Sequence, residues 1–136
     1  MKGDACFTPE GERVSVSPMD SEKTSLCKQA VIVSREGMGS GDHELGLILL
    51  RKYLTSDLER DEWAERYVFF NGGVKAALLD AEVKSLLKQL EERGALVIFC
   101  GTCLDYFGLS TSHDIGRNGC MGDVRESMAM ERVDYL

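Results

Sequence analysis

Hydrophobic positions in this chain form short apolar runs that alternate with segments of helical periodicity. Three runs, at residues 30–34, 67–70 and 96–99, are rich in β-branched and aromatic residues and have the length of buried parallel strands. Between the second and third runs, four apolar residues follow the i, i+3, i+4, i+7 spacing of an amphipathic helix: Val83, Leu86, Leu87 and Leu90. The pattern therefore predicts strand and helix in alternation.

The order of these segments predicts an α/β fold. Helical spacing follows the first run at residues 45–53, and shorter helical segments are expected at 74–79, 104–107 and 124–130. Residues 133–136 have the composition of a further short strand. Alternating strands and helices with short connections favour a parallel sheet with helices on both faces.

Composition divides the chain into an arm and one domain. Residues 1–28 contain both prolines and many polar side chains without apolar periodicity, so we expect a mobile or loosely docked N-terminal arm before a domain at 29–136. The net charge of −7 disfavours nucleic acid and acidic membrane surfaces as partners. No leader or long apolar run opens the chain, which predicts a cytoplasmic protein.

Candidate chemistry lies where the third apolar run ends, at Cys100-Gly-Thr-Cys103. Two thiols at the junction of a strand and a helix would lie near main-chain N–H groups that favour negative charge, so a thiol pKa below the ordinary value is expected. The chain has five cysteines, an odd number, which in a reducing compartment favours reactive or metal-binding thiols over structural disulfides.

Glycine-rich segments follow the other two predicted strands. Because the carboxyl ends of parallel strands meet at one edge of a sheet, these segments and the cysteine pair should converge. Closely spaced main-chain N–H groups there would form an anion-binding pocket. The first loop lacks the Lys-Ser/Thr of a P-loop and a full G-x-G-x-x-G pattern, so a nucleotide site is disfavoured. The predicted pocket-lining or anion-binding residues are Gly39, Ser40, Gly41, Asp42, Asn71, Gly72, Gly73, Gly101 and Thr102.

Three segments, 38–46, 70–75 and above all 100–109, resemble the DsrE-like domain of the YedF family, which is described as sulfurtransferase-like or involved in selenium metabolism. The resemblance runs from about residue 30 to the C-terminus. It implies a three-layer α/β/α fold with a mainly parallel sheet of about five strands. It also implies that Cys100, framed by Gly94 and Gly108, accepts sulfur as a persulfide, and that Cys103 is the extra cysteine of the YedF branch.

The sequence departs from this family at two places. YedF proteins usually begin with a TusA-like domain bearing Cys-Pro-x-Pro, whereas this arm is shorter and carries Cys6-Phe-Thr-Pro9. Cys120 also stands where the family usually has Asn. The resemblance thus implies a separate sulfur donor, such as a TusA-like protein, an acceptor protein, and assembly into a dimer, trimer or hexamer.

Four functions fit the cysteine pair. The first is a sulfur or selenium carrier with Cys100 and Cys103 as its catalytic residues, needing no cofactor. A thioredoxin-type dithiol protein is disfavoured because no proline follows Pro18. A metal site would need Cys120 and His113 from distant loops, since no second close ligand pair follows the first. The fourth is a non-enzymatic, oligomeric binding or scaffold module of a sulfur relay.

Overall fold

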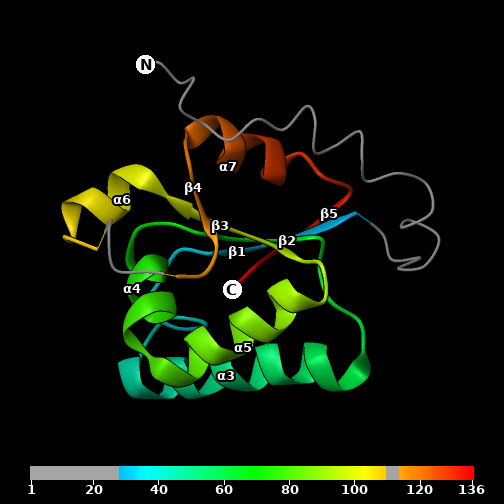
Figure 1. The fold of residues 1–136 in the computed structure, drawn as a ribbon. Helices are drawn as coiled ribbons and strands as arrows, with labels where there is room; N and C mark the ends of the chain where they lie inside the picture. The colour runs from blue at the N-terminus through cyan, green and yellow to red at the C-terminus, as the bar shows by residue number, and fades with distance from the viewer. Residues whose placement is uncertain (1–27, 110–113) are drawn as a thin grey trace.

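A five-stranded parallel sheet forms the centre of the protein in a computed structural model that describes residues 28–109 and 114–136 (Figure 1). The strand order is β4-β3-β2-β1-β5, and every neighbouring pair is parallel. The strands are β1 (Gln29–Val33), β2 (Arg66–Phe69), β3 (Leu96–Cys100), β4 (Arg117–Gly119) and β5 (Arg132–Tyr135). The predicted α/β fold with a parallel sheet is confirmed.

Helices cover both faces of the sheet. Figure 1 shows α3 and α5 below the strands and α7 above them, which gives the three layers. The described helices are α3 (His43–Arg60), α4 (Gly72–Leu79), α5 (Ala81–Glu92), α6 (Gly101–Tyr106) and α7 (Met121–Met128). Each predicted helical segment corresponds to one of these helices, and every helix begins two or three residues before the predicted position.

Strand alternation builds two unequal hydrophobic cores. In β1, Val31 and Val33 point into the larger core, which lies between the sheet and helices α3 and α5 and in which Leu54 and Leu87 are fully buried. Ile32 belongs to the smaller core on the other face. Successive side chains of a strand point to opposite faces, so a run that is apolar at every position requires both faces to be covered.

The main helices begin at acidic caps. Asp42 precedes α3 and accepts a hydrogen bond from the N–H of Leu45, 2.8 Å away. Asp80 precedes α5 and accepts from the N–H groups of Glu82 and Val83. A carboxylate in this position satisfies donors that have no partner within the helix and complements the helix dipole.

Strand β4 was not predicted. Its three residues read as a polar turn, and only pairing with β3 makes them a strand. Gly119 permits this approach, because a Cβ there would lie 2.6 Å from Cγ2 of Ile98. A three-residue edge strand has too little periodicity to be recognised from its own sequence.

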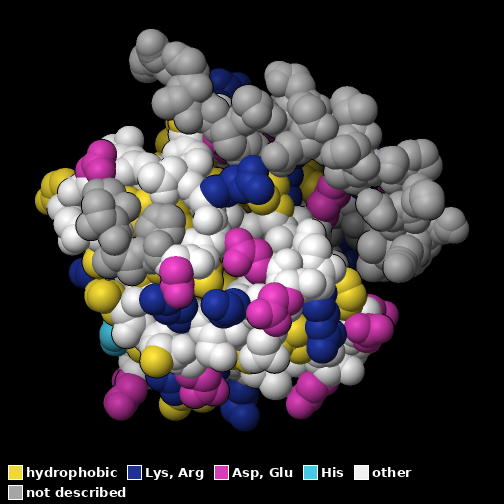
Figure 2. All heavy atoms as spheres, viewed as in Figure 1, with side chains coloured by type: hydrophobic (Ala, Val, Ile, Leu, Met, Phe, Trp, Pro, Cys, Tyr) yellow, Lys and Arg dark blue, Asp and Glu magenta, His cyan; other side chains and the backbone are white. Residues whose placement is uncertain are grey.

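Charges of both signs are mixed on the surface. On the face shown in Figure 2, basic and acidic side chains alternate and do not gather into a patch of one sign. Lys84 pairs with Asp114 at 3.3 Å, and Arg93 pairs with Asp61 at 3.2 Å.

Among the described helices, none is long and apolar enough to cross a membrane. The predicted N-terminal arm lies almost wholly outside the described residues.

Candidate thiol site

The candidate site begins where β3 passes directly into α6. Cys100 is the last residue of β3 and the residue before the first turn of α6, and it is 4% exposed. Cys103 lies one turn further on and is only partly buried. Its side chain forms a hydrogen bond with that of Cys100. The two thiols are therefore neighbours, and the second is the more accessible.

Asn71, at the end of β2, lies against the second thiol. Its main-chain N–H donates a hydrogen bond to the Sγ of Cys103, with a donor to sulfur distance of 3.1 Å. The residue has a φ of 53° and a ψ of −132°, a conformation that an L-residue other than glycine rarely adopts. The ends of β2 and β3 therefore lie together, as predicted, and the contact between them is made by the main chain of Asn71.

The two glycines after Asn71 fix this loop to the end of β1. A Cβ on Gly73 would lie 2.1 Å from the carbonyl oxygen of Val33, so no other residue fits without displacing the backbone. A Cβ on Gly72 would lie 3.1 Å from Cγ of Glu36, a tighter contact than side chains normally make. The glycines therefore serve close packing, which holds the N–H of Asn71 in place.

The pKa of the Cys103 thiol differs from the one that the sequence predicts. Burial raises the pKa of the Cys103 thiol above its ordinary value, and the neighbouring Cys100 adds to the rise. The N–H of Asn71 opposes it but does not prevail. The predicted lowering of a thiol pKa is thus wrong for Cys103, because removal from water disfavours the charged form more than one N–H donor favours it.

The first glycine-rich loop takes no part in this contact. Gly39 and Gly41 have φ values of 81° and 127°, and a Cβ on either would meet nothing within 4 Å. Ser40 is exposed, and Asp42 caps α3. Residues 39–42 are exposed to solvent, and Gly39 and Gly41 serve a turn, whereas Gly37 at the start of the loop is buried against the backbone of Gly46.

Gly101 and Thr102 lie between the cysteines in the first turn of α6. A Cβ on Gly101 would lie 3.4 Å from the carbonyl oxygen of Gly119, an ordinary contact. Thr102 is exposed. Of the predicted residues, the structure thus brings Asn71 and the two cysteines into direct contact.

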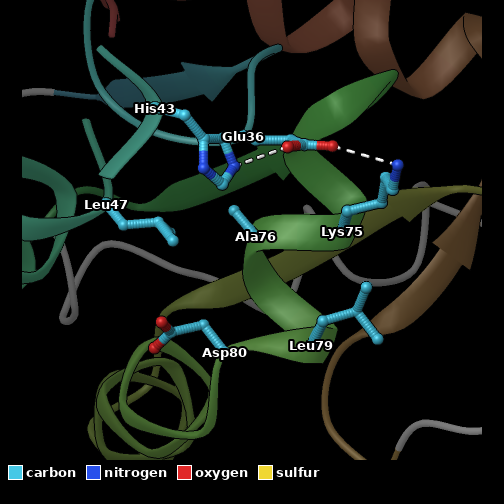
Figure 3. A pocket seen from close by; sticks show the side chains of 7 residues that line it. All are labelled: Glu36, His43, Leu47, Lys75, Ala76, Leu79 and Asp80. Atoms are coloured by element: carbon cyan, nitrogen blue, oxygen red, sulfur yellow. Dashed lines mark ion pairs between the residues drawn. The ribbon is translucent and has the colours of Figure 1, made fainter. Parts of the chain in front are cut away.

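A separate hollow lies beside α3 and α4 (Figure 3). It has a volume of about 270 Å³, and the residues lining it are Glu36, His43, Leu47, Lys75, Ala76, Leu79 and Asp80. None of the nine predicted pocket-lining residues is among them. Figure 3 shows the carboxylate of Glu36 between the side chains of His43 and Lys75.

Two ion pairs lie within this hollow, and a cation–π contact joins it to the end of α6. Glu36 lies 2.6 Å from Nε2 of His43 and 3.0 Å from Nζ of Lys75, and these contacts, chiefly the one with Lys75, lower its pKa. The Lys75 Nζ also lies 4.7 Å from the ring centroid of Phe107, the residue that ends α6. The sequence analysis missed Glu36 and Lys75. A single Lys in the otherwise apolar helix after Asn71 was the available signal.

A metal site receives no support from the described part of the chain. There, no three side chains of His, Cys, Asp or Glu form a group that could hold a metal ion. His113, one of the ligands considered for such a site, lies outside the described residues.

Comparisons with known proteins identify the fold. No protein-family model and no curated protein matches the chain. The solved structure of the ychN protein from E. coli matches with a TM-score of 0.60 and 18% identity, over 82% of this chain and 100% of that one. A conserved protein of unknown function, BT1422 from Bacteroides thetaiotaomicron, matches with a TM-score of 0.58 and 16% identity, over 88% and 100%.

These identities show a shared fold and nothing finer. The fold is the DsrE-like α/β fold, as the sequence resemblance implied. A fold does not by itself imply a function, so the function of this chain has to be argued from the chemistry of the site.

Proposed function

We propose that this chain is a sulfur-transfer protein that carries a persulfide on the Cys100–Cys103 pair. The observation that carries the proposal is the position of the pair: neighbouring thiols at the carboxyl edge of a parallel sheet, one of them accessible and held by a main-chain N–H. In open parallel sheets, this edge is where ligands bind.

The chemistry is an exchange between sulfur atoms. A thiolate of the pair attacks the outer sulfur of a donor persulfide, R–S–SH. The bond between the two donor sulfurs breaks, the donor leaves as R–S⁻, and the protein holds the outer sulfur as Cys–S–SH. An acceptor thiolate then attacks this outer sulfur and regenerates the cysteine thiolate. No metal or cofactor is needed for either step.

The finer assignment follows the sequence resemblance. We propose a YedF-like protein of the cytoplasm that assembles as a homo-oligomer, takes sulfur or selenium from a donor such as a TusA-like protein, and passes it to an acceptor. A reducing compartment keeps both thiols available for exchange. Tyr106 and Met121, which are 83% and 58% exposed, are available for contacts with such partners.

Mass spectrometry of the loaded protein tests the proposal. The reduced chain would be incubated with a small persulfide donor, treated with an alkylating reagent and digested with trypsin. Cleavage after Arg93 and Arg117 gives a peptide whose only cysteines are Cys100 and Cys103. We expect a mass gain of one sulfur atom on this peptide. A double variant, Cys100→Ala with Cys103→Ala, is the matched control, and an unmodified wild-type peptide would contradict the proposal.

A dithiol oxidoreductase is the second candidate, favoured by the hydrogen bond between the two thiols. Its product would be a disulfide between Cys100 and Cys103, with loss of two hydrogen atoms and no added sulfur. Single variants, Cys100→Ala and Cys103→Ala, distinguish the two functions, because neither can form this disulfide and only the persulfide function adds sulfur to their peptide.

A further inference from the structure

The accessibility of the two thiols decides which one a donor can reach. Cys100 ends a strand paired on both sides, between β2 and β4, and is 4% exposed. Cys103 is partly exposed on α6. Exchange requires the incoming sulfur to approach the thiolate in line with the bond that breaks, so a buried Sγ is shielded from any donor.

The hydrogen bond from Asn71 favours the same cysteine. An N–H donor binds a thiolate more strongly than a thiol, because hydrogen bonds to a charged acceptor are about twice as strong as neutral ones. The donor does not depend on a mobile side chain, since it belongs to the backbone. Gly73, packed against Val33, and Gly72, packed against Glu36, hold that backbone at a positive φ.

We propose that Cys103, and not Cys100, is the thiol that first accepts sulfur, and that Asn71 is its positioning residue. This inference rests on the proposed function and reverses the roles implied by the family resemblance. The Cys103 thiolate attacks R–S–SH, the donor S–S bond breaks, and R–S⁻ departs. The product is Cys103–S–SH, with the N–H of Asn71 directed at its inner sulfur.

The neighbouring thiol then has a defined role. The Cys100 thiolate can attack the inner sulfur of Cys103–S–SH, which releases HS⁻ and joins the two cysteines in a disulfide. A dithiol reductant, oxidised in turn to its own disulfide, returns both cysteines to thiols. Cys100 is therefore the resolving cysteine, and its burial does not prevent this step because the sulfur that it attacks belongs to its neighbour, Cys103.

Single variants test the assignment of roles. Cys100→Ala and Cys103→Ala would be loaded with the same small persulfide, and sulfur on the 94–117 peptide would be followed over time. We expect Cys100→Ala to load at least as fast as the wild type, because Cys100 raises the pKa of Cys103, and Cys103→Ala to load roughly tenfold more slowly. Loading of Cys103→Ala but not of Cys100→Ala would overturn the inference while the persulfide function stands. Absence of loading in the wild type and in both single variants would instead overturn the proposed function.

Asn71 variants test the positioning role without any sulfur donor. The rate of Cys103 alkylation by iodoacetamide would be measured against pH in the Cys100→Ala background. Asn71→Val disfavours the positive φ and displaces the N–H, so we expect the profile to move up by about one pH unit, a tenfold slower reaction at fixed pH. Asn71→Gly keeps the φ accessible and should leave the profile unchanged.

The melting temperature of each variant separates positioning from folding. A purely structural role would change melting while leaving the alkylation profile of the folded protein in place, and that outcome would overturn the role of Asn71. If Asn71→Val does not fold, Asn71→Ala serves instead, since alanine also disfavours a φ of 53° but is not β-branched.

Discussion

The glycine-rich turn at residues 39–41 after β1 and the glycine pair that begins α4 after β2 have similar compositions but different physical roles. Gly39 and Gly41 have positive φ values and open space around them, so these glycines form a solvent-exposed turn. Gly73 has a backbone carbonyl where its side chain would be, so this glycine allows close packing. The packed loop also holds the donor that faces Cys103. Glycine content alone therefore does not identify a binding loop.

The sharpest test of this comparison is Gly73→Ala. The added methyl group would lie 2.1 Å from the carbonyl oxygen of Val33, and neither backbone can move freely in a packed core. We expect the free energy of unfolding to fall by about 3 kcal/mol. Urea denaturation measures the change, and a loss below about 1 kcal/mol would show that the contact relaxes easily.

A second test compares the caps that lie beyond these loops. Asp80 caps α5 and also pairs with Arg51, whereas Asp42 makes one cap bond at the end of the open loop. We expect Asp80→Ala to lower the free energy of unfolding by about 1.5 kcal/mol and Asp42→Ala by less, about 0.7 kcal/mol. If both substitutions lowered the free energy of unfolding equally, the ion pair of Asp80 with Arg51 would add nothing to the stability that the cap provides.

The contribution of Asp80 should depend on pH. Arg51, above all, lowers the pKa of the Asp80 carboxyl below its ordinary value of 3.8. A group with a lowered folded pKa stabilises above its unfolded pKa, and this contribution is lost as the pH falls through the folded value. The difference in unfolding free energy between wild type and Asp80→Ala should therefore shrink below about pH 3.8, which denaturation at several acidic pH values would detect.

Gly39→Ala should have a smaller effect than Gly73→Ala. No atom obstructs the new methyl group, so the cost is that of placing alanine at a φ of 81°, about 1 kcal/mol. Thermal unfolding measures the loss. Sulfur loading of the 94–117 peptide should be unchanged, and a loading defect in the folded variant would show that the open loop takes part in the reaction.

The smallest effect is expected for Glu36→Gln. Its ion pairs with His43 and Lys75 are partly exposed, so their loss should lower the unfolding free energy by less than about 0.5 kcal/mol near neutral pH. Because Lys75 chiefly lowers the pKa of Glu36, this stabilisation is present above pH 4.5 and is lost as the pH falls through the folded pKa. Denaturation at pH 7 and pH 3 checks both statements. Equal effects of the substitution at the two values would contradict them.

A strand could be predicted from the sequence wherever its own residues carried the full hydrophobic pattern of a buried strand. The apolar runs that became β1, β2 and β3 identified their strands because both faces of each are buried. The thiol pair could be placed at a strand end for the same reason. Strand β4 and the hollow at Glu36 could not be anticipated, since each exists only through contacts between distant segments.

The amino-acid sequence by itself determined the alternation of strands and helices, the parallel sheet, and the cysteine pair at its carboxyl edge, because these follow from local periodicity and from the handedness of parallel connections. Tertiary structure decided the rest of the site. It buried Cys100, left Cys103 accessible, and turned the N–H of Asn71 toward sulfur. Burial and the direction of a main-chain donor depend on packing between β1, β2 and α6, which no single segment specifies.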